Sequence, residues 1–152
     1  GQSDAEEETE PVKKTPSPLR AARQDQRIAV IEEIADDIYS VKFILQSLGY
    51  DVRSFSSTTP FLSLVVEFQP VLIIVDMMIS NGGGYEVIQG IRARSMLGVS
   101  ILAITAEAME GEVEDVFQAG VQDVLGKPYT VSELQEKLET LFKNLAASPG
   151  DT

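Results

Sequence analysis

The sequence predicts an α/β domain in which helices cover both faces of a doubly wound, five-stranded parallel sheet. Between residues 27 and 145, short apolar runs alternate five times with helical patterns, which is typical of βαβ units. Residues 71–75 (VLIIV) are apolar throughout, as expected of a strand buried on both faces. This run ends on Asp76, so a carboxylate is delivered to the edge where such sheets bind ligands.

The first half of the domain holds two strand and helix pairs. Residues 28–31 (IAVI) are apolar and favour a strand, and the helical pattern that follows stops at Gly49. The apolar face of that helix consists of Ile38, Val41, Ile44, Leu45 and Leu48. Residues 51–55 alternate in polarity, which predicts a more exposed strand. Pro60 then opens a short helix that ends before Pro70.

The second half completes the alternation after the Asp76 strand. A third helix is marked by Tyr85, Ile88 and Ile91. Residues 99–105 and 121–126 predict the last two strands, and an acidic helix between them stops at Gly120. Thr130 and Glu133 form a capping box that starts the final helix. Its apolar stripe consists of Leu134, Leu138, Leu141, Phe142 and Leu145.

The two ends of the chain differ from the domain between them. Residues 1–26 are acidic and proline-rich and carry no apolar periodicity, which predicts a disordered linker. Residues 146–152 are expected to form a flexible C-terminal tail. Because the chain begins with Gly and the acidic segment precedes the domain, we expect it to be the C-terminal part of a larger chain.

Composition excludes several classes of function. The chain has neither Cys nor His, which rules out disulfides, thiolate or imidazole metal sites and His general bases. No apolar run approaches the roughly 18 residues of a membrane span. The net charge of -12 argues against a nucleic-acid surface, which needs clustered Lys and Arg. We therefore expect a cytoplasmic protein without membrane or nucleic-acid contact.

Polar residues follow four of the predicted strands. The first strand ends on Glu32 and Glu33, the third on Asp76 and the fourth on Thr105, while Lys127 follows the fifth. Parallel strands bring these residues to one edge of the sheet. Clustered carboxylates repel one another and favour a cation such as Mg²⁺, which prefers oxygen ligands. With a nearby ammonium and hydroxyl, this set suits phosphoryl transfer onto a carboxylate.

The acidic pair, Asp76, Thr105-Ala106 and Lys127-Pro128 follow one another at spacings of 43, 29 and 22 residues from Glu33 onward. This ordered set resembles the receiver domain of two-component response regulators and hybrid histidine kinases. The resemblance covers residues 27–145 and implies the flavodoxin-like, CheY-like fold with strand order 2-1-3-4-5. It also implies a C-terminal receiver of a chain such as a hybrid histidine kinase.

The resemblance assigns a role to each site residue. It makes Asp76 the phosphoacceptor, with a histidine kinase or phosphotransfer protein as the partner. Mg²⁺ would be held by Glu33, Asp76 and the backbone carbonyl of Met78, and by Glu32 through water. Thr105 and Lys127 would bond phosphoryl oxygens, and the Lys127-Pro128 peptide would be cis. Such a protein is not an enzyme acting on other substrates, but it takes part in its own phosphotransfer and dephosphorylation.

Several residues depart from the family's usual pattern. Both members of the acidic pair are Glu, where at least one Asp is usual. Ser80 replaces a usual Pro, residues 82–84 (GGG) predict a looser loop, and Val124 stands where Tyr or Phe is usual. These departures keep a second hypothesis open, a pseudo-receiver that binds proteins without phosphorylation. A third, a Mg²⁺-dependent phosphohydrolase, is disfavoured because Met78 stands where a general acid is needed.

Overall fold

The computed structural model describes residues 26–32, 41–56, 61–79, 83–94, 98–106 and 110–147. Its centre is a five-stranded parallel sheet with strand order β2-β1-β3-β4-β5. The strands are β1 (Arg27–Ile31), β2 (Asp51–Phe55), β3 (Leu72–Asp76), β4 (Ser100–Thr105) and β5 (Asp123–Gly126). The predicted fold and strand order are confirmed.

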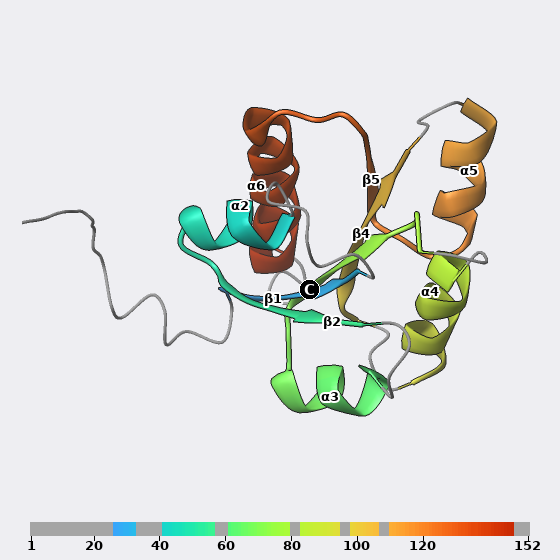
Figure 1. The fold of residues 1–152 in the computed structure, drawn as a ribbon, viewed down its shortest axis with the longest axis horizontal. Helices are drawn as coiled ribbons and strands as arrows, with labels where there is room; N and C mark the ends of the chain where they lie inside the picture. Colours follow the sequence, from blue (N-terminus) through green and yellow to red (C-terminus); the bar gives the residue numbers. More distant parts are fainter. Residues whose placement is uncertain are drawn as a thin grey trace, which may run out of the picture.

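Helices cover both faces of this sheet (Figure 1). They are α2 (Val41–Ser47), α3 (Phe61–Phe68), α4 (Gly83–Ala93), α5 (Glu110–Gln118) and α6 (Val131–Ala147). Helices α2 and α6 pack on one face, while α3, α4 and α5 pack on the other. The sheet is therefore doubly wound, and its strand ends are left open for a site.

The apolar strands explain this three-layer arrangement of helices, sheet and helices. Leu72 and Ile74 of β3 point into the cluster under α2 and α6, whereas Ile73 and Val75 point into the cluster under α3, α4 and α5. All four side chains have no exposed surface. Burying each side chain of this kind stabilises the fold by about 1.5–3 kcal/mol. Because β3 is apolar on both faces, it takes the central position in the sheet.

The predicted helix signals are confirmed where the structure describes them. Gly49 and Gly120 have positive φ values of 97° and 114°, a conformation that glycine adopts without steric cost. The capping box is formed at α6: the Thr130 N–H donates to Glu133 Oε1 at 2.9 Å, and the Glu133 N–H donates to Thr130 Oγ1 at 3.0 Å. Gln69 also has a positive φ, of 57°, which the sequence did not predict.

Two boundaries differ from the sequence-based expectation. Gly83 and Gly84 were expected in a loop, but they form the first turn of α4. Helix α6 continues through Ala147, into the predicted tail. The predicted linker up to residue 25, Glu33 and the start of the first helix lie outside the described residues. Within the described ranges, no helix is long and apolar enough to cross a membrane.

Candidate functional site

Asp76 is the last residue of β3, and both of its carboxylate oxygens have protein partners. Oδ1 accepts a hydrogen bond of 2.9 Å from the Met78 N–H. Oδ2 lies 3.2 Å from Lys127 Nζ. The backbone beside it is fixed as well, because Asp76 pairs in register with Ile104 and the Met77 N–H donates to the Ile104 carbonyl at 2.7 Å. The carboxylate is thus held at the carboxyl end of the sheet.

Lys127 reaches Asp76 from the end of β5. Its N–H donates to the Thr105 carbonyl at 2.8 Å, and the Lys127-Pro128 peptide bond is cis, as predicted. The side chains of Lys127 and Asp76 are 38% and 25% exposed. An ion pair this exposed adds only about 0–1 kcal/mol to stability. Its main effect is therefore to place a positive charge beside the carboxylate.

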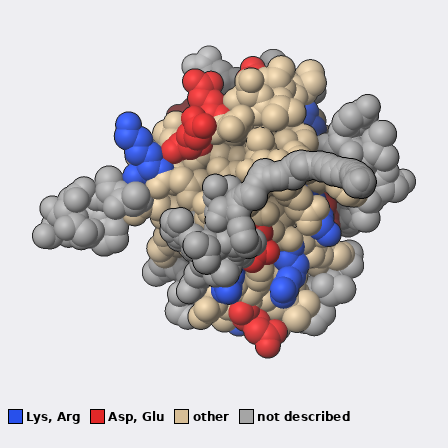
Figure 2. Space-filling model, turned by 90° about the vertical axis from the view of Figure 1, so that its left-hand side faces the viewer, with Lys and Arg blue, Asp and Glu red and all other residues tan. Residues whose placement is uncertain are grey.

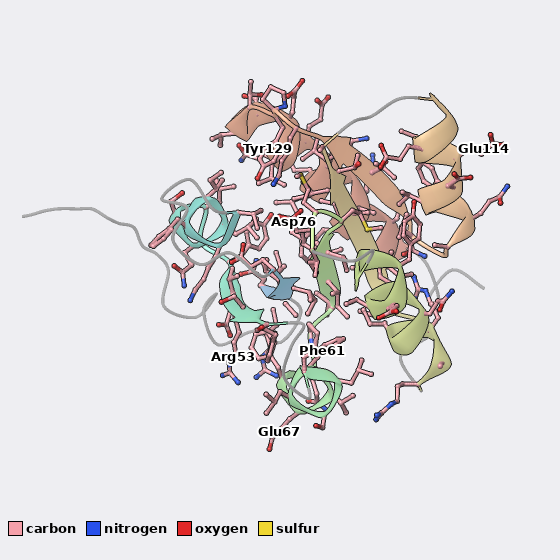
Figure 3. All side chains as sticks on the ribbon, turned by 45° about the vertical axis from the view of Figure 1, so that its right-hand side comes forward. Arg53, Phe61, Glu67, Asp76, Glu114 and Tyr129 are labelled. Carbon is pink, nitrogen blue, oxygen red and sulfur yellow. The ribbon has the colours of Figure 1, made fainter. Side chains whose placement is uncertain are left out.

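A cavity of about 660 Å³ lies over these residues. Its charged lining residues are Glu32, Asp76 and Lys127. Apolar and small side chains from β1, α2, β3 and β4 line the rest, together with the segment that follows β5. Figure 3 shows Asp76 at the end of β3 and Tyr129, another lining residue, above it. The structure thus brings together four of the predicted site residues, Glu32, Asp76, Met78 and Lys127, at one concave surface.

The two remaining predicted site residues are Thr105 and Glu33. Thr105 is the last residue of β4 and only 1% exposed, and it does not line the cavity, whereas its neighbours Ile104 and Ala106 do. Since side chains alternate along a strand, Thr105 points to the opposite face of the sheet from Ile104. Glu33 lies outside the described residues. Met78, the other predicted ligand, lines the cavity and is 53% exposed.

The donor chemistry of the cavity suits a hard cation. Glu32 and Asp76 both line it and supply carboxylate oxygens, the ligand type that Mg²⁺ prefers. Among the described residues, no three Asp, Glu, His or Cys side chains gather closely enough to form a complete metal site. A complete set would thus include Glu33 or backbone and water oxygens. The two described carboxylates are compatible with Mg²⁺.

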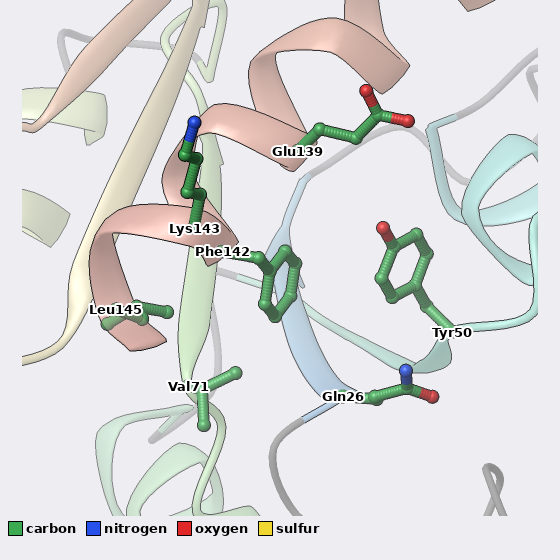
Figure 4. A pocket seen from close by; sticks show the side chains of 7 residues that line it. All are labelled: Gln26, Tyr50, Val71, Glu139, Phe142, Lys143 and Leu145. Atoms are coloured by element: carbon green, nitrogen blue, oxygen red, sulfur yellow. The ribbon is translucent and has the colours of Figure 1, made fainter. Parts of the chain in front are cut away.

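A second cavity of about 660 Å³ lies at the opposite end of the sheet (Figure 4). Gln26, Tyr50 and Val71, which each precede a strand, form part of its lining. The Tyr50 ring stacks on Phe142 of α6, with centroids 5.4 Å apart. Burial, and then the charge of Glu139, raise the pKa of Tyr50. This largely apolar cavity is remote from the strand-end residues, so the candidate site is the one at Asp76.

Sequence reasoning missed one feature of the site. Gly84 is buried in the first turn of α4, and a Cβ added there would lie 2.8 Å from Met77 Sδ and 3.0 Å from Met77 Cα. The glycine run was a visible signal, but a glycine run also predicts a loop. Only the packing of α4 against the residue after Asp76 distinguishes the two interpretations.

Comparison with known proteins gives the family. The model of the response regulator receiver domain matches residues 28–139. DNA-binding response regulator MtrA of Mycobacterium tuberculosis is 27% identical over 126 residues, which are 83% of this chain and 54% of that protein. The chain thus spans about half the length of this relative. Chemotaxis protein CheY-3 of Vibrio cholerae is 26% identical over 124 residues, 80% of this chain and 95% of that protein.

Solved structures agree on the fold. Chemotaxis response regulator CheY4 of Vibrio cholerae superposes with a TM-score of 0.66 at 21% identity, covering 75% of this chain and 96% of that one. The receiver domain of the LuxO repressor protein from Vibrio parahaemolyticus gives a TM-score of 0.65 at 21% identity, covering 78% and 91%. The family model spans most of the described sheet and helices, and the strand order is the expected one. The chain belongs to the response regulator receiver domain family.

Proposed function

We propose that this domain is a phosphoacceptor switch in which Asp76 receives a phosphoryl group from a phosphohistidine of a histidine kinase or phosphotransfer protein. The observation that carries the proposal is the position of the Asp76 carboxylate, at a cavity wall 3.2 Å from the Lys127 ammonium. Membership of the receiver family supports it. The family's phosphoacceptor role also means that the domain acts on itself rather than on a separate substrate.

In the transfer step, one carboxylate oxygen of Asp76 attacks the phosphorus of the phosphohistidine. A new O–P bond forms as the N–P bond breaks, and the imidazole leaves with the electron pair of that bond. Lys127 stands where it offsets the negative charge of the incoming phosphoryl oxygens. The Met78 N–H holds the other side of the carboxylate, so that the nucleophile is oriented before the donor arrives.

Mg²⁺ is the cation used by this family, and it would be held here by Glu32, Glu33, Asp76 and the Met78 carbonyl. When bound, it neutralises charge on the phosphoryl oxygens and the carboxylates. Of this set, the structure describes Met78, which lines the cavity, and the two carboxylates Glu32 and Asp76. Both have the oxygen chemistry that the ion needs.

Phosphorylation would act on the rest of the domain by shifting a population between two states. Thr105 lies buried at the end of β4, next to the cavity, and α5 packs on the same face of the sheet through Val116. Inward movement of the Thr105 hydroxyl toward a phosphoryl oxygen would bias β4 and α5 toward an output-competent arrangement. The expected output is binding of another protein.

The remaining expectations concern partners and location. We expect no nucleic-acid contact by this domain, because the net charge of the chain is -12. On the face in Figure 2, the described Lys and Arg side chains stand apart from one another, with uncharged and acidic side chains between them. The relative from Mycobacterium tuberculosis is named DNA-binding, and this chain covers about half of it. A cytoplasmic location stays a prediction.

The test uses the purified chain with Mg²⁺ and a small phosphodonor such as acetyl phosphate. Intact mass should rise by one phosphoryl group in the wild type and by none in Asp76→Asn, which keeps the size of the side chain but loses the nucleophile. Mass spectrometry after borohydride reduction would locate the acyl phosphate. Equal labelling of both proteins would overturn the assignment of Asp76.

The pseudo-receiver hypothesis is favoured by one specific observation. Val124, where the family usually has an aromatic residue, is only 8% exposed and packs in the cluster under α3, α4 and α5. An aliphatic side chain in that position lacks the aromatic rotamer that usually moves with Thr105. A Mg²⁺ titration monitored by tyrosine fluorescence distinguishes the pseudo-receiver from the phosphoacceptor. No binding at millimolar metal and no labelling would favour the pseudo-receiver.

A further inference from the structure

We propose that Gly83 and Gly84 are positioning residues for the Asp76 carboxylate. Their missing side chains let the first turn of α4 press directly against the turn that follows β3. That turn carries the Met78 N–H, the donor that holds Asp76 Oδ1. The inference rests on the proposed function and assigns to the glycine pair the task of orienting its nucleophile.

The turn after Asp76 is fixed by backbone hydrogen bonds on one side. The Met77 N–H donates to the Ile104 carbonyl at 2.7 Å, which anchors the start of the turn on β4. The Ile79 N–H donates to the Asp76 carbonyl at 3.3 Å and closes the turn. Met78, between them, is 53% exposed, so its own side chain contributes little to its position. The direction of its N–H therefore depends on how Met77 and Ile79 are held.

The glycine pair holds the same two residues from the other side. A Cβ on Gly84 would meet Met77 Sδ at 2.8 Å, and Met77 Cα and Cε at 3.0 Å. A Cβ on Gly83 would meet Ile79 Cγ2 at 2.9 Å. Ile79 is only 5% exposed, so its side chain has little room to move away. Helix α4 thus contacts both ends of the turn, at Met77 and Ile79. The side chain of Met78 lies between them and is exposed.

The requirement at these two positions is for space and not for an unusual backbone. Among the described glycines, the positive φ values belong to Gly49 and Gly120, whereas Gly83 and Gly84 have helical geometry. Alanine is a better helix former than glycine, so α4 alone gives no reason for two glycines in its first turn. Their contacts with Met77 and Ile79 supply that reason.

A side chain at position 84 would displace Met77, including its backbone. The Met78 N–H would then turn away from Asp76 Oδ1, and the carboxylate would lose one of its two fixed contacts. Misplacement of a reacting group by a fraction of an ångström to an ångström slows a reaction by about ten- to a hundredfold. Gly84→Ala should therefore react slowly even though it folds.

The experiment compares Gly84→Ala and Gly83→Ala with two matched controls. Gly90→Ala changes a glycine in the same helix, where the added Cβ would meet only the end of the Leu62 side chain at 3.2 Å. Gly111→Ala changes a glycine of α5 that has nothing within 4 Å of the added atom. Each protein is labelled with acetyl phosphate and Mg²⁺, and the amide exchange rate of Met78 is measured by NMR without phosphodonor.

We expect Gly84→Ala to be labelled about tenfold or more slowly than the wild type, with faster exchange of the Met78 amide. Gly83→Ala should change both quantities in the same direction, and both controls should match the wild type. Adding Met77→Ala to Gly84→Ala removes Sδ and Cε from the contact and should recover part of the rate. Met77→Ala alone serves as its reference.

Two results would overturn the inference. One is an unchanged Met78 exchange rate in both Gly84→Ala and Gly83→Ala. The other is an equal slowing of labelling in Gly90→Ala, which would indicate general loosening of α4. If the wild type itself takes no phosphoryl group, the proposed function fails, yet the Met78 exchange rates still decide whether the glycines orient this turn.

Discussion

Arg92, in the last turn of α4, connects three segments through hydrogen bonds donated by its guanidinium. Its Nε and Nη2 donate to the Gly120 carbonyl at 2.9 and 2.7 Å, and its Nη1 donates to the Val99 carbonyl at 2.9 Å. Nη2 also donates to Gln122 Oε1, which accepts from the Ile101 N–H. Burial lowers the pKa of Arg92, but a guanidinium stays protonated in proteins. The side chain thus joins α4 to the start of β4 and to the turn after α5.

Arg92→Ala is expected to lower the free energy of unfolding by about 2 kcal/mol, because several acceptors lose a charged donor. The side chain is only partly buried, which lets water replace some of these bonds. Arg92→Lys keeps the charge but cannot reach both carbonyls, so it should lose an intermediate amount. Urea denaturation of the three proteins measures this order, and an alanine variant as stable as the lysine variant would contradict it.

At the same scale, the candidate site shows what a sequence reveals about single residues. Asp76, Glu32 and Lys127 were predictable because topology alone sends strand ends to one edge, and the structure places them on one cavity. The contact between Gly84 and Met77 was not predictable, since it depends on how closely a helix approaches a loop. The buried orientation of Thr105 is likewise a result of packing.

At the scale of elements, Tyr50 joins the start of β2 to helix α6. Its ring stacks on Phe142 at an interplanar angle of 15°. Burial raises the pKa of Tyr50 above 10.0, and the charge of Glu139 raises it further. Above pH 10 the unfolded chain loses the Tyr50 proton first. The free energy of unfolding therefore falls as pH rises through this range, until the folded protein ionises as well.

Tyr50→Phe should remove this contribution while keeping the stacked ring. The variant should lose less stability than the wild type as the pH rises above 10. Urea midpoints at pH 8, 10 and 11 measure the difference. The lysine side chains also titrate in this range, but they are the same in the two proteins, so their effect cancels in the comparison. The pKa of Tyr85 is also raised, first by burial and then by Asp115 and Glu112, so Tyr85→Phe should change the pH dependence in the same direction and gives a second test of the effect. Parallel curves for Tyr50→Phe and the wild type would refute the prediction.

Element boundaries were predictable where one residue type decides them. Gly49 and Gly120 end helices because they adopt positive φ, and Thr130 with Glu133 caps α6. The predicted start of α4 was wrong, because glycine considered alone favours a loop, whereas Gly83 and Gly84 lie in the helix. The end of α6 was also placed too early, because the small residues after Leu145 carry no apolar signal although the helix continues.

At the scale of the whole molecule, one sheet separates two apolar clusters. The cluster under α2 and α6 includes Ile28, and the cluster under α3, α4 and α5 includes Ile88. This division followed from the alternation of apolar runs, because a sheet that is apolar on both faces needs helices on both. The strand order was implied by the resemblance to the receiver family and not by the apolar pattern. Both clusters are nonetheless built on the same strands, so they should unfold together.

Ile28→Val and Ile88→Val each remove one methyl group from a fully buried side chain, one in each cluster. Each should lower the free energy of unfolding by about 1 kcal/mol. Because the sheet lies between the two sites, the losses should add within about 0.5 kcal/mol in the double variant. Ile73→Val combined with Ile88→Val is the control, since both of these side chains lie in one cluster and can interact. Circular dichroism and tyrosine fluorescence should follow one urea transition in every variant, whereas separate transitions would mean that the two halves of the core fold independently.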